Sequence, residues 1–526
     1  MFNKIDDYAD HYLDNKKILQ YLKIISNIVM IIVWVSFVLT PMTGDLKVFM
    51  ASANQSNYIS KNLIVGSFKA WELKSVFSRL LMYFIYKISV LFTSYNTYAF
   101  EIMSKLIYSI FIIIISYISM KLIFVEEHKR VSIYSRITII SFMAMHIGCQ
   151  MQVEMTVSLL ILLAFSLYIN AIITGKNQSS KLLGAGMLIG STFFFKSVLL
   201  LLSVTVVAAI AIFEIQNGIA YRMKRLLLVI LGSCLMLFIT TIFILFINPV
   251  EFQDMLDASA FQNTLLSSSL SIRNIICKFS YNHLMRIGFV PIVIVGVVSF
   301  LFNLCSNIYS KRWNLVLMHL IMWIMPAIFI VLSNKYFVYH FVVYIFPSLI
   351  EVYYAVLLKK KFVKHVLFVI SAVIFGWYLI FFSIISNNVR SYISYDLQTN
   401  RKTEEFLREI SFDRNQKILY LDDGRGGYYL GNPSYLKYFF PLPLQRLEED
   451  SNLKCHIDSV NMAMKFEGKY ISVYEEWFFK YGKYQNLKEK IMNEYEYVGN
   501  YFVFSPPHSY LESDIEVKAY KLYERK

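Results

Sequence analysis

Asp45 is the first residue of this sequence whose type and position could support chemistry. It lies in the segment TPMTGDLKVF, directly after the first long apolar run, and is expected where a membrane meets water. A carboxylate there could take the proton of an acceptor hydroxyl or bind a metal ion. The alternative is a solvated turn, because Gly-Asp is a common turn pair.

Two further acidic residues have settings of the same kind. Glu154 lies in GCQMQVEMTVS, a very short segment between two apolar runs. It could act as a second carboxylate beside the first, or it could be a favourable negative charge at a helix N-terminus. Glu72 lies in WELKSVFSR together with Trp71, Lys74 and Arg79. This polar cluster could shape a pocket at the membrane surface, or it could simply anchor the chain among lipid headgroups.

Basic residues that interrupt apolar segments are candidates for binding phosphate. Lys196 interrupts STFFFKSVLLLL, where it needs an anionic partner such as a lipid phosphate, unless it snorkels to the interface. Lys335 and His340 lie in SNKYFVYHF and could clamp phosphate as a point charge and a donor. The alternative for these two is an aromatic belt and a helix cap. Glu101 and Lys105 stand four residues apart; we expect them to pair with each other and assign them no role.

The elements that must position these residues are predicted to be membrane helices. The chain has 526 residues, of which 57% are hydrophobic and 17% charged, whereas soluble proteins carry about 45–50% apolar and about 25% charged residues. This composition excludes a soluble enzyme, a disordered chain and a fibrous protein. A span needs about 20 apolar residues, and apolar runs predict eleven spans, at 24–40, 97–125, 132–149, 155–173, 182–195, 197–213, 226–247, 285–305, 314–332, 339–358 and 363–385.

The distribution of charge predicts how the spans are oriented. The formal net charge is +15, but residues 387–526 hold 20 basic and 21 acidic groups, so the excess belongs to residues 1–386. The net positive charge therefore does not indicate a nucleic-acid partner. Alternate loops are all basic, as in Lys16-Lys17, Arg222 to Arg225 and Lys359 to Lys361, which is typical of cytoplasmic loops. The N-terminus is then inside the cell, and eleven spans place the tail outside.

Two segments outside the spans are expected to carry structure of their own. Residues 41–95 form a long first external loop, in which 78–92 is expected to be a helix lying in the membrane interface or, alternatively, a short span. Residues 387–526 are predicted to be a small α/β domain. It would contain helices at 403–410 and 485–494 and strands at 417–421, 470–474, 501–504 and 515–522. The segment DDGRGGYYLG after the first strand is interpreted as a turn or a carbohydrate-facing loop, because it lacks nucleotide-binding spacing.

Taken together, these features resemble the GT-C superfamily of polyprenyl-phosphate-sugar-dependent glycosyltransferases. The layout is similar to bacterial relatives of the protein O-mannosyltransferases and the lipid A aminoarabinose transferases. Asp45 matches the acid that follows the first span in that family, and Glu154 matches a second acid between spans three and four. STFFFKSVLLLL and KYFVYHFVVYIFP (335–347) are similar to two further family segments. One departure is Leu46, which stands where the mannosyltransferases have a second acid.

The resemblance implies a multi-pass α-helical membrane protein of about 11 spans, with a catalytic domain at 1–386 and an extracytoplasmic α/β domain at 387–526. It implies transfer of a monosaccharide, a hexose or pentose, from a polyprenyl-phosphate donor to a hydroxyl of a cell-surface glycan, lipid or protein, with inversion. The catalytic candidates are Asp45, Glu154 and Glu72, and the candidates for binding the donor phosphate are Lys196, Lys335, His340, Arg79 and Lys74. No metal is required, although a divalent cation is compatible with these acids.

This interpretation predicts an enzyme of the cell envelope, in the plasma membrane and in contact with membrane lipid. Two alternatives are a flippase or transporter for lipid-linked sugars and a polysaccharide polymerase. A transporter would carry charged or Pro/Gly-broken residues deep in its spans and often shows internal repeats, neither of which is evident here. A polymerase would explain a large external loop but not a 140-residue external tail.

Overall fold

The fold was analysed in a computed structural model of the chain. Contacts between Cα atoms divide the chain into two compact units. The first comprises Met1–Val38, Tyr108–Ile239 and Leu270–Asn387, and the second comprises Leu39–Ile107, Thr240–Ser269 and Asn388–Lys526. The structure describes residues 16–69, 75–125, 128–144, 150–196, 207–209, 212, 219–248, 291–333, 342–357, 361–436, 453–479, 484–507 and 515–526.

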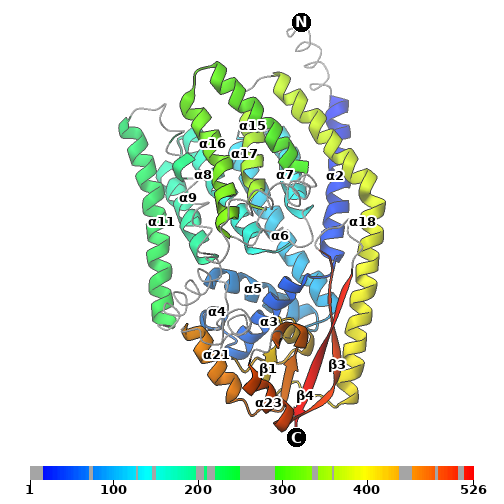
Figure 1. Ribbon diagram of the computed structural model, residues 1–526. Helices are drawn as coiled ribbons and strands as arrows, with labels where there is room; N and C mark the ends of the chain where they lie inside the picture. Colours follow the sequence, from blue (N-terminus) through cyan, green and yellow to red (C-terminus); the bar gives the residue numbers. More distant parts are fainter. Residues whose placement is uncertain are drawn as a thin grey trace. The chain divides into compact units, whose positions relative to one another are not determined.

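The first unit is helical throughout its described part (Figure 1). Long runs of Leu, Ile, Val and Phe form these helices, because a helix satisfies every backbone hydrogen bond within one segment. The helices that lie wholly or partly in this unit are α2 (Lys16–Leu39), α6 (Tyr98–Ile123), α7 (His128–Met143), α8 (Val153–Thr174), α9 (Gln178–Ser191), η2 (Thr192–Phe194), α11 (Ile219–Ile247), α15 (Pro291–Tyr309), α16 (Trp313–Ser333), α17 (Ile345–Leu357) and α18 (Lys361–Glu409).

Helices α9 and α11 pack closely through small residues. A Cβ atom added to Gly186 would lie 2.1 Å from the carbonyl oxygen of Val229, and one added to Gly190 would lie 2.6 Å from that of Ser233. The Ser233 hydroxyl also donates to the Gly186 carbonyl, at 2.9 Å. Small residues that let two backbones approach are typical of helix pairs in membranes.

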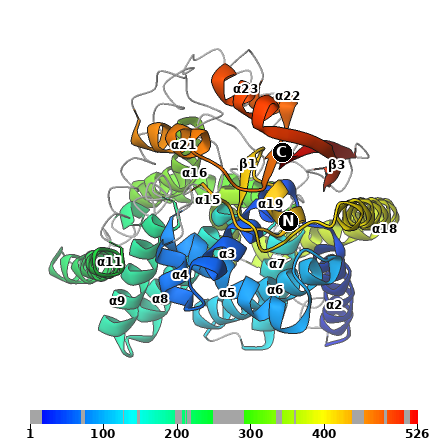
Figure 2. The same ribbon diagram turned by 90° about the horizontal axis from the view of Figure 1, so that it is seen from below.

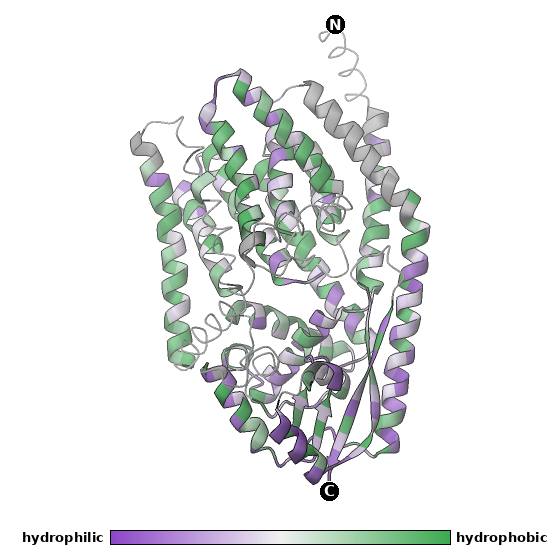
Figure 3. Cartoon of the chain, in the orientation of Figure 1, coloured by the Kyte–Doolittle hydropathy of each residue, from purple (hydrophilic) through white to green (hydrophobic). Residues whose placement is uncertain are grey.

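Five described helices are long and apolar enough to cross a membrane, or up to six if the bent pair Lys23–Leu39 and Gly44–Ile59 is one span. The chain is therefore mostly helical and fits a multi-pass membrane protein, and Figure 3 shows the apolar residues along these helices. Ten of the eleven predicted segments overlap described helices, although parts of 132–149, 285–305 and 339–358 lie outside the described residues, as does most of 197–213. The count of eleven stays a prediction. The five that pass are Tyr98–Ile123, Val153–Thr174, Met223–Ile247, Ile292–Tyr309 and Trp313–Ile330.

Two segments are more helical than predicted. Residues 41–95 contain three helices rather than one, namely α3 (Gly44–Ile59), α4 (Leu63–Lys69) and α5 (Val76–Phe92). The predicted span at 363–385 and the predicted helix at 403–410 are parts of one helix, α18. No Gly or Pro stands between Gly376 and Gly424, so the sequence has no strong helix breaker in that interval.

The second unit contains a four-stranded sheet in the order β1-β2-β4-β3. Strand β1 (Ile418–Leu421) pairs in parallel with β2 (Tyr470–Val473), and β4 (Glu516–Arg525) pairs antiparallel with both β2 and β3 (Tyr495–Ser505). Figures 1 and 2 show the long β3–β4 pair at one edge. Each predicted strand overlaps an observed one.

Short helices accompany the strands of this unit. They are α19 (Gly426–Leu430), α21 (Lys454–Met464), α22 (Glu475–Phe478) and α23 (Gln485–Glu494). Residues of α21, α22 and α23 lie in the hydrophobic core of the sheet. Leu487 and Ile491 of α23 pack with buried strand residues such as Leu419 and Ile471. Gly499 in β3 has φ +146°, and a Cβ there would lie 2.5 Å from the Phe406 ring, so this position requires glycine. One unit boundary lies beside the predicted domain boundary after 386, but the second unit also includes Leu39–Ile107.

Candidate active site

Asp45 is exposed at the start of helix α3. The Thr43 hydroxyl caps this helix by accepting from the Leu46 amide at 3.4 Å, and Asp45 stands in the first turn. A negative charge in the first turn is favourable against the helix dipole. The Asp45 carboxylate makes no hydrogen bond or ion pair with any residue that the structure describes. It is therefore free to accept a proton from a bound molecule.

The backbone that leads to Asp45 is fixed by side chains of α6. The Tyr98 hydroxyl donates to the Leu39 carbonyl at 2.5 Å, and Glu101 accepts from the Met42 amide at 2.5 Å. The Lys105 ammonium donates to the carbonyls of Thr40 and Pro41. A polar side chain in an apolar helix is costly unless it is used, and here three of them hold one short segment.

A buried ionic cluster centred on Lys47 lies two residues beyond Asp45 in the chain. The Lys47 Nζ atom is 2.6 Å from Asp396 Oδ1 and 3.4 Å from Glu101 Oε1, and none of the three side chains is more than 1% exposed. It also donates to the Tyr429 hydroxyl at 2.7 Å. Removing one partner of such a buried pair is strongly destabilising, because the other charge stays buried. The Lys47 cluster (Lys47, Glu101 and Asp396) therefore ties α3, α6 and α18 together at one point.

The Gly-rich segment after β1 supplies two tyrosines to the Lys47 cluster. Tyr428 donates to Glu101 Oε1 at 2.9 Å, while Tyr429 contacts Lys47 and donates to the Phe504 carbonyl at 3.1 Å. Gly426 is required at the start of α19, because a Cβ there would lie 2.2 Å from a carboxylate oxygen of Asp422. The segment predicted to be a turn or a carbohydrate-facing loop is thus a short helix whose residues 426–430 are buried.

Asp422 and Asp423, directly after β1, have opposite electrostatic settings. Burial and the neighbouring charge of Asp423 raise the pKa of Asp422 to about 7, although Ser472 and the Gly424 amide donate to its carboxylate. Burial also opposes ionisation of Asp423, but the Arg425 guanidinium holds the pKa of that carboxyl below its usual value. Of the two, Asp422 is the carboxyl that changes its charge near neutral pH.

In the first unit, two of the predicted site residues contact each other. Lys196 Nζ lies 2.6 Å from Glu154 Oε1, with the Glu154 side chain fully buried and that of Lys196 16% exposed. Glu154 stands in the first turn of α8, and Lys196 follows Phe195, the C-cap residue of η2. The anionic partner that Lys196 was expected to need is therefore supplied, at least in part, by Glu154. Asp45 belongs to the second unit.

The remaining predicted site residues divide into one that is placed and four that are not. Arg79 lies in α5 with 3% of its surface exposed. Glu72, Lys74, Lys335 and His340 lie outside the described residues. Among the residues that are described, no group of three or more His, Cys, Asp or Glu side chains is arranged to hold a metal ion.

Sequence reasoning did not find Lys47, Asp396 or Tyr429. Lys47 and Asp396 are 349 residues apart, so no local spacing indicates that they meet. The one available signal was the presence of Glu101 and Lys105 inside a predicted span, since charges there are normally functional or paired. They were expected to pair with each other, and their charges do interact. The structure also places Glu101 against Lys47 and Lys105 against two backbone carbonyls.

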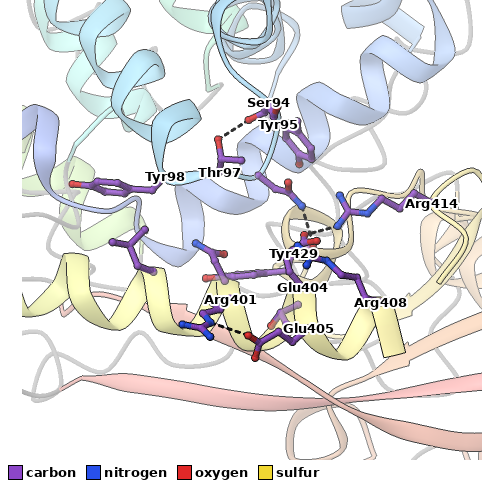
Figure 4. A pocket seen from close by; sticks show the side chains of 14 residues that line it. Ser94, Tyr95, Thr97, Tyr98, Arg401, Glu404, Glu405, Arg408, Arg414 and Tyr429 are labelled. Carbon is purple, nitrogen blue, oxygen red and sulfur yellow. Dashed lines mark hydrogen bonds and ion pairs between the residues drawn. The ribbon is translucent and has the colours of Figure 1, made fainter. Parts of the chain in front are cut away.

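A pocket of about 700 Å³ opens in the second unit, next to Tyr429. It is lined by residues 94–98, by α18 between Leu397 and Arg408, and by Arg414 and Tyr429. Figure 4 shows the side chains that line it, among them Tyr95, Tyr98, Tyr429 and the charged residues of α18 and Arg414. Ligand pockets typically have volumes of about 300–1,000 Å³, so this one is large enough for a small organic ligand.

No family model matches the sequence, and no curated protein matches it. In structure the chain is similar to an oligosaccharyltransferase of Archaeoglobus fulgidus in the apo form, with 13% identity, a TM-score of 0.49 and coverage of 96% of this chain and 74% of that chain. The complex of that archaeal protein with zinc and sulfate gives 13% identity, a TM-score of 0.42 and coverage of 94% and 72%. These values are too low to support a conclusion about the fold or function of this chain.

Proposed function

We propose that this chain is an integral membrane glycosyltransferase of the GT-C kind, which moves a monosaccharide from a polyprenyl-phosphate donor to an acceptor hydroxyl on the external face of the plasma membrane. The observation that carries the proposal is the setting of Asp45. An exposed carboxylate follows the first apolar helix, and the segment that presents it is fixed by buried polar side chains. A rigid support of this kind is what a catalytic group requires.

In the proposed reaction Asp45 is the general base. Its carboxylate takes the proton of the acceptor hydroxyl as the hydroxyl oxygen attacks the anomeric carbon of the donor sugar. The bond between that carbon and the phosphate oxygen breaks, and the electron pair leaves with the polyprenyl phosphate. Because one displacement occurs at the anomeric carbon, the product has inverted configuration. The acceptor is a glycan, lipid or protein at the cell surface.

The leaving phosphate gains negative charge and needs cationic partners. Lys196 is the proposed principal one, with Arg79, Lys74, Lys335 and His340 as further candidates. In this proposal Glu154 is a positioning residue, because its carboxylate holds the Lys196 ammonium at 2.6 Å. Glu72 remains a second candidate for the acid–base role. The N-terminus is proposed to be cytoplasmic and residues 387–526 extracytoplasmic.

The test compares Asp45→Asn with Glu496→Gln, a matched loss of an exposed carboxylate on β3. Release of polyprenyl phosphate is measured with a panel of polyprenyl-phosphate hexose and pentose donors, in membranes that also supply the acceptor. We expect Asp45→Asn to lower turnover by about 100-fold or more, with thermal unfolding unchanged, and Glu496→Gln to behave like the wild type.

Unchanged turnover in Asp45→Asn would overturn the assignment of the base. Movement of the donor across the membrane without release of polyprenyl phosphate would overturn the proposed transfer and favour a lipid-linked sugar transporter. Turnover only with a lipid-linked oligosaccharide would contradict a monosaccharide donor and favour a polymerase.

A further inference from the structure

The geometry of the pocket beside Tyr429 points to a binding site for a short acidic saccharide, which we infer to be the acceptor. This inference rests on the proposed function and adds the chemical class of the acceptor. The pocket has a volume of about 700 Å³, and every lining residue belongs to the second unit. Its chemistry has three parts, which are aromatic faces, neutral polar groups and one excess positive charge.

The aromatic and polar parts come from the loop between α5 and α6 and from Tyr429. Tyr95, Tyr98 and Tyr429 line the pocket together with the hydroxyl and amide side chains of Ser94, Asn96 and Thr97 (Figure 4). The tyrosines contribute apolar ring surface, because the hydroxyls of Tyr98 and Tyr429 are engaged with the Leu39 carbonyl and with Lys47. The hydroxyl and amide side chains can both donate and accept. A sugar ring has the same combination of apolar C–H faces and hydroxyl groups.

The loop that presents these side chains is preorganised. Asn96 adopts a left-handed conformation with φ 57°, and its amide donates to the Tyr429 carbonyl at 2.9 Å. The Thr97 hydroxyl donates to the Ser94 carbonyl at 2.7 Å. The Tyr95 ring packs edge-on against Tyr428, with centroids 5.6 Å apart. A site that is ordered before the ligand arrives loses less entropy on binding.

Of the charged side chains that line the pocket, one guanidinium is available to bind a ligand. Three arginines and two glutamates line the pocket, and Arg401 pairs with Glu405 at 2.8 Å while Arg414 pairs with Glu404. The guanidinium of Arg408 is exposed and makes no hydrogen bond or ion pair with any residue in the described ranges. Arginine binds carboxylate and phosphate in a bidentate manner. The lining therefore favours a saccharide that carries one negative charge.

The pocket is also connected to the proposed active site through side chains. The Tyr429 hydroxyl contacts Lys47 of the Lys47 cluster, and the Tyr98 hydroxyl holds the Leu39 carbonyl in the segment that leads to Asp45. Residues that line the pocket thus also support the segment of backbone that leads to Asp45, the proposed base. The pocket and the proposed base therefore share supporting side chains.

The test measures binding by isothermal titration calorimetry, with the full-length protein in detergent micelles. The probes are a disaccharide ending in glucuronic acid and its uncharged methyl ester. We expect the acid to bind about tenfold more tightly than the ester, because a charge-assisted hydrogen bond is stronger than a neutral one. Arg408→Gln should abolish this preference. Arg390→Gln, at an exposed arginine of α18 outside the pocket, should retain it.

Equal binding of the acid and the ester by the wild type would overturn the inference, and so would an unchanged preference in Arg408→Gln. Binding of an anionic phospholipid vesicle that the disaccharide cannot displace would identify a lipid headgroup as the ligand instead and would also overturn it. Sugar transfer that depends on Asp45 without binding of the disaccharide would defeat this inference alone. Binding without any transfer would defeat the proposed function alone.

Discussion

The two units bury charged and ionisable side chains in different ways. In the second unit, the Lys47 cluster joins one ammonium to two carboxylates, and its three members come from three helices. Lys47 lies two residues beyond the exposed Asp45. In the first unit, Glu351 of α17 contacts His319 of α16 at 2.8 Å and Asn303 of α15 at 2.8 Å. All of these side chains except Asp45 are fully or almost fully buried.

The difference lies in how the buried charge is compensated. Asn307 Nδ2 lies 3.1 Å from His319 Nε2, so a neutral imidazole can accept there and donate from Nδ1 to Glu351. The Glu351 network (Glu351, His319, Asn303 and Asn307) therefore relies on hydrogen bonds from neutral groups. The Lys47 cluster relies on full charges. Removal of one member of a cluster of full charges is the more destabilising, because the remaining charge stays buried.

The largest expected effect is that of Lys47→Met. It would leave the carboxylates of Glu101 and Asp396 buried without this ammonium, so we expect the free energy of unfolding to fall by about 3–5 kcal/mol. The measurement is denaturant unfolding in mixed micelles. Lys61→Met, at an exposed lysine after α3, should change the free energy of unfolding by less than about 0.5 kcal/mol. Equal effects of the two substitutions would show that the Lys47 cluster does not stabilise the second unit.

A smaller and pH-dependent effect is expected at Asp422, a buried carboxyl whose hydrogen bonds come from neutral donors. Burial and the charge of Asp423 raise its pKa from 3.8 to about 7 in the folded protein. The folded state therefore binds a proton more tightly than the unfolded state, and stability falls as the pH rises from about 4 to about 7. Above that range both states are ionised and the loss is constant.

Asp422→Asn removes this titrating group. The difference between the variant and the wild type therefore isolates the contribution of Asp422 to the pH dependence of stability from that of the other buried charges. The midpoint of thermal unfolding is measured from pH 4 to pH 8 for the wild type and the variant. The midpoint of the variant relative to the wild type should rise from pH 4 to about pH 7 and stay level above that. A relative midpoint that falls with pH would contradict the raised pKa.

Sequence reasoning found those parts of the fold that depend on local patterns. The helix at 485–494 and the strand that begins at Tyr470 begin where predicted, because apolar periodicity and turn residues mark them. Asp45 was chosen as a candidate because it follows an apolar run directly, and its role stays a prediction. Helix α3 was missed, since its mixture of small, polar and apolar residues gives no clear amphipathic stripe. The local signal for this helix is its N-cap residue, Thr43.

The support of the candidate site could not be predicted, for a physical reason. Lys47, Glu101 and Asp396 come together through tertiary packing of three helices, and nothing in the local sequence of any one of them specifies the other two. The pairing of Glu154 with Lys196 was missed for a related reason. Each was interpreted by itself as a residue facing a ligand, whereas the fold places them 2.6 Å apart.

The smallest expected effect is that of Glu351→Gln in the first unit. The introduced amide keeps the acceptor for His319 Nδ1, but its NH₂ group cannot accept the hydrogen bond that Asn303 donates to Glu351 Oε2 at 2.8 Å. We expect a loss of about 1–2 kcal/mol in the free energy of unfolding, measured in the same micelles, since one hydrogen bond is lost and the charge is removed together with its desolvation cost. A loss as large as that of Lys47→Met would mean that the Glu351 network also contains a full ion pair, with His319 protonated. The contrast between the two units would then lie only in which elements are joined, and not in how their buried charges are compensated.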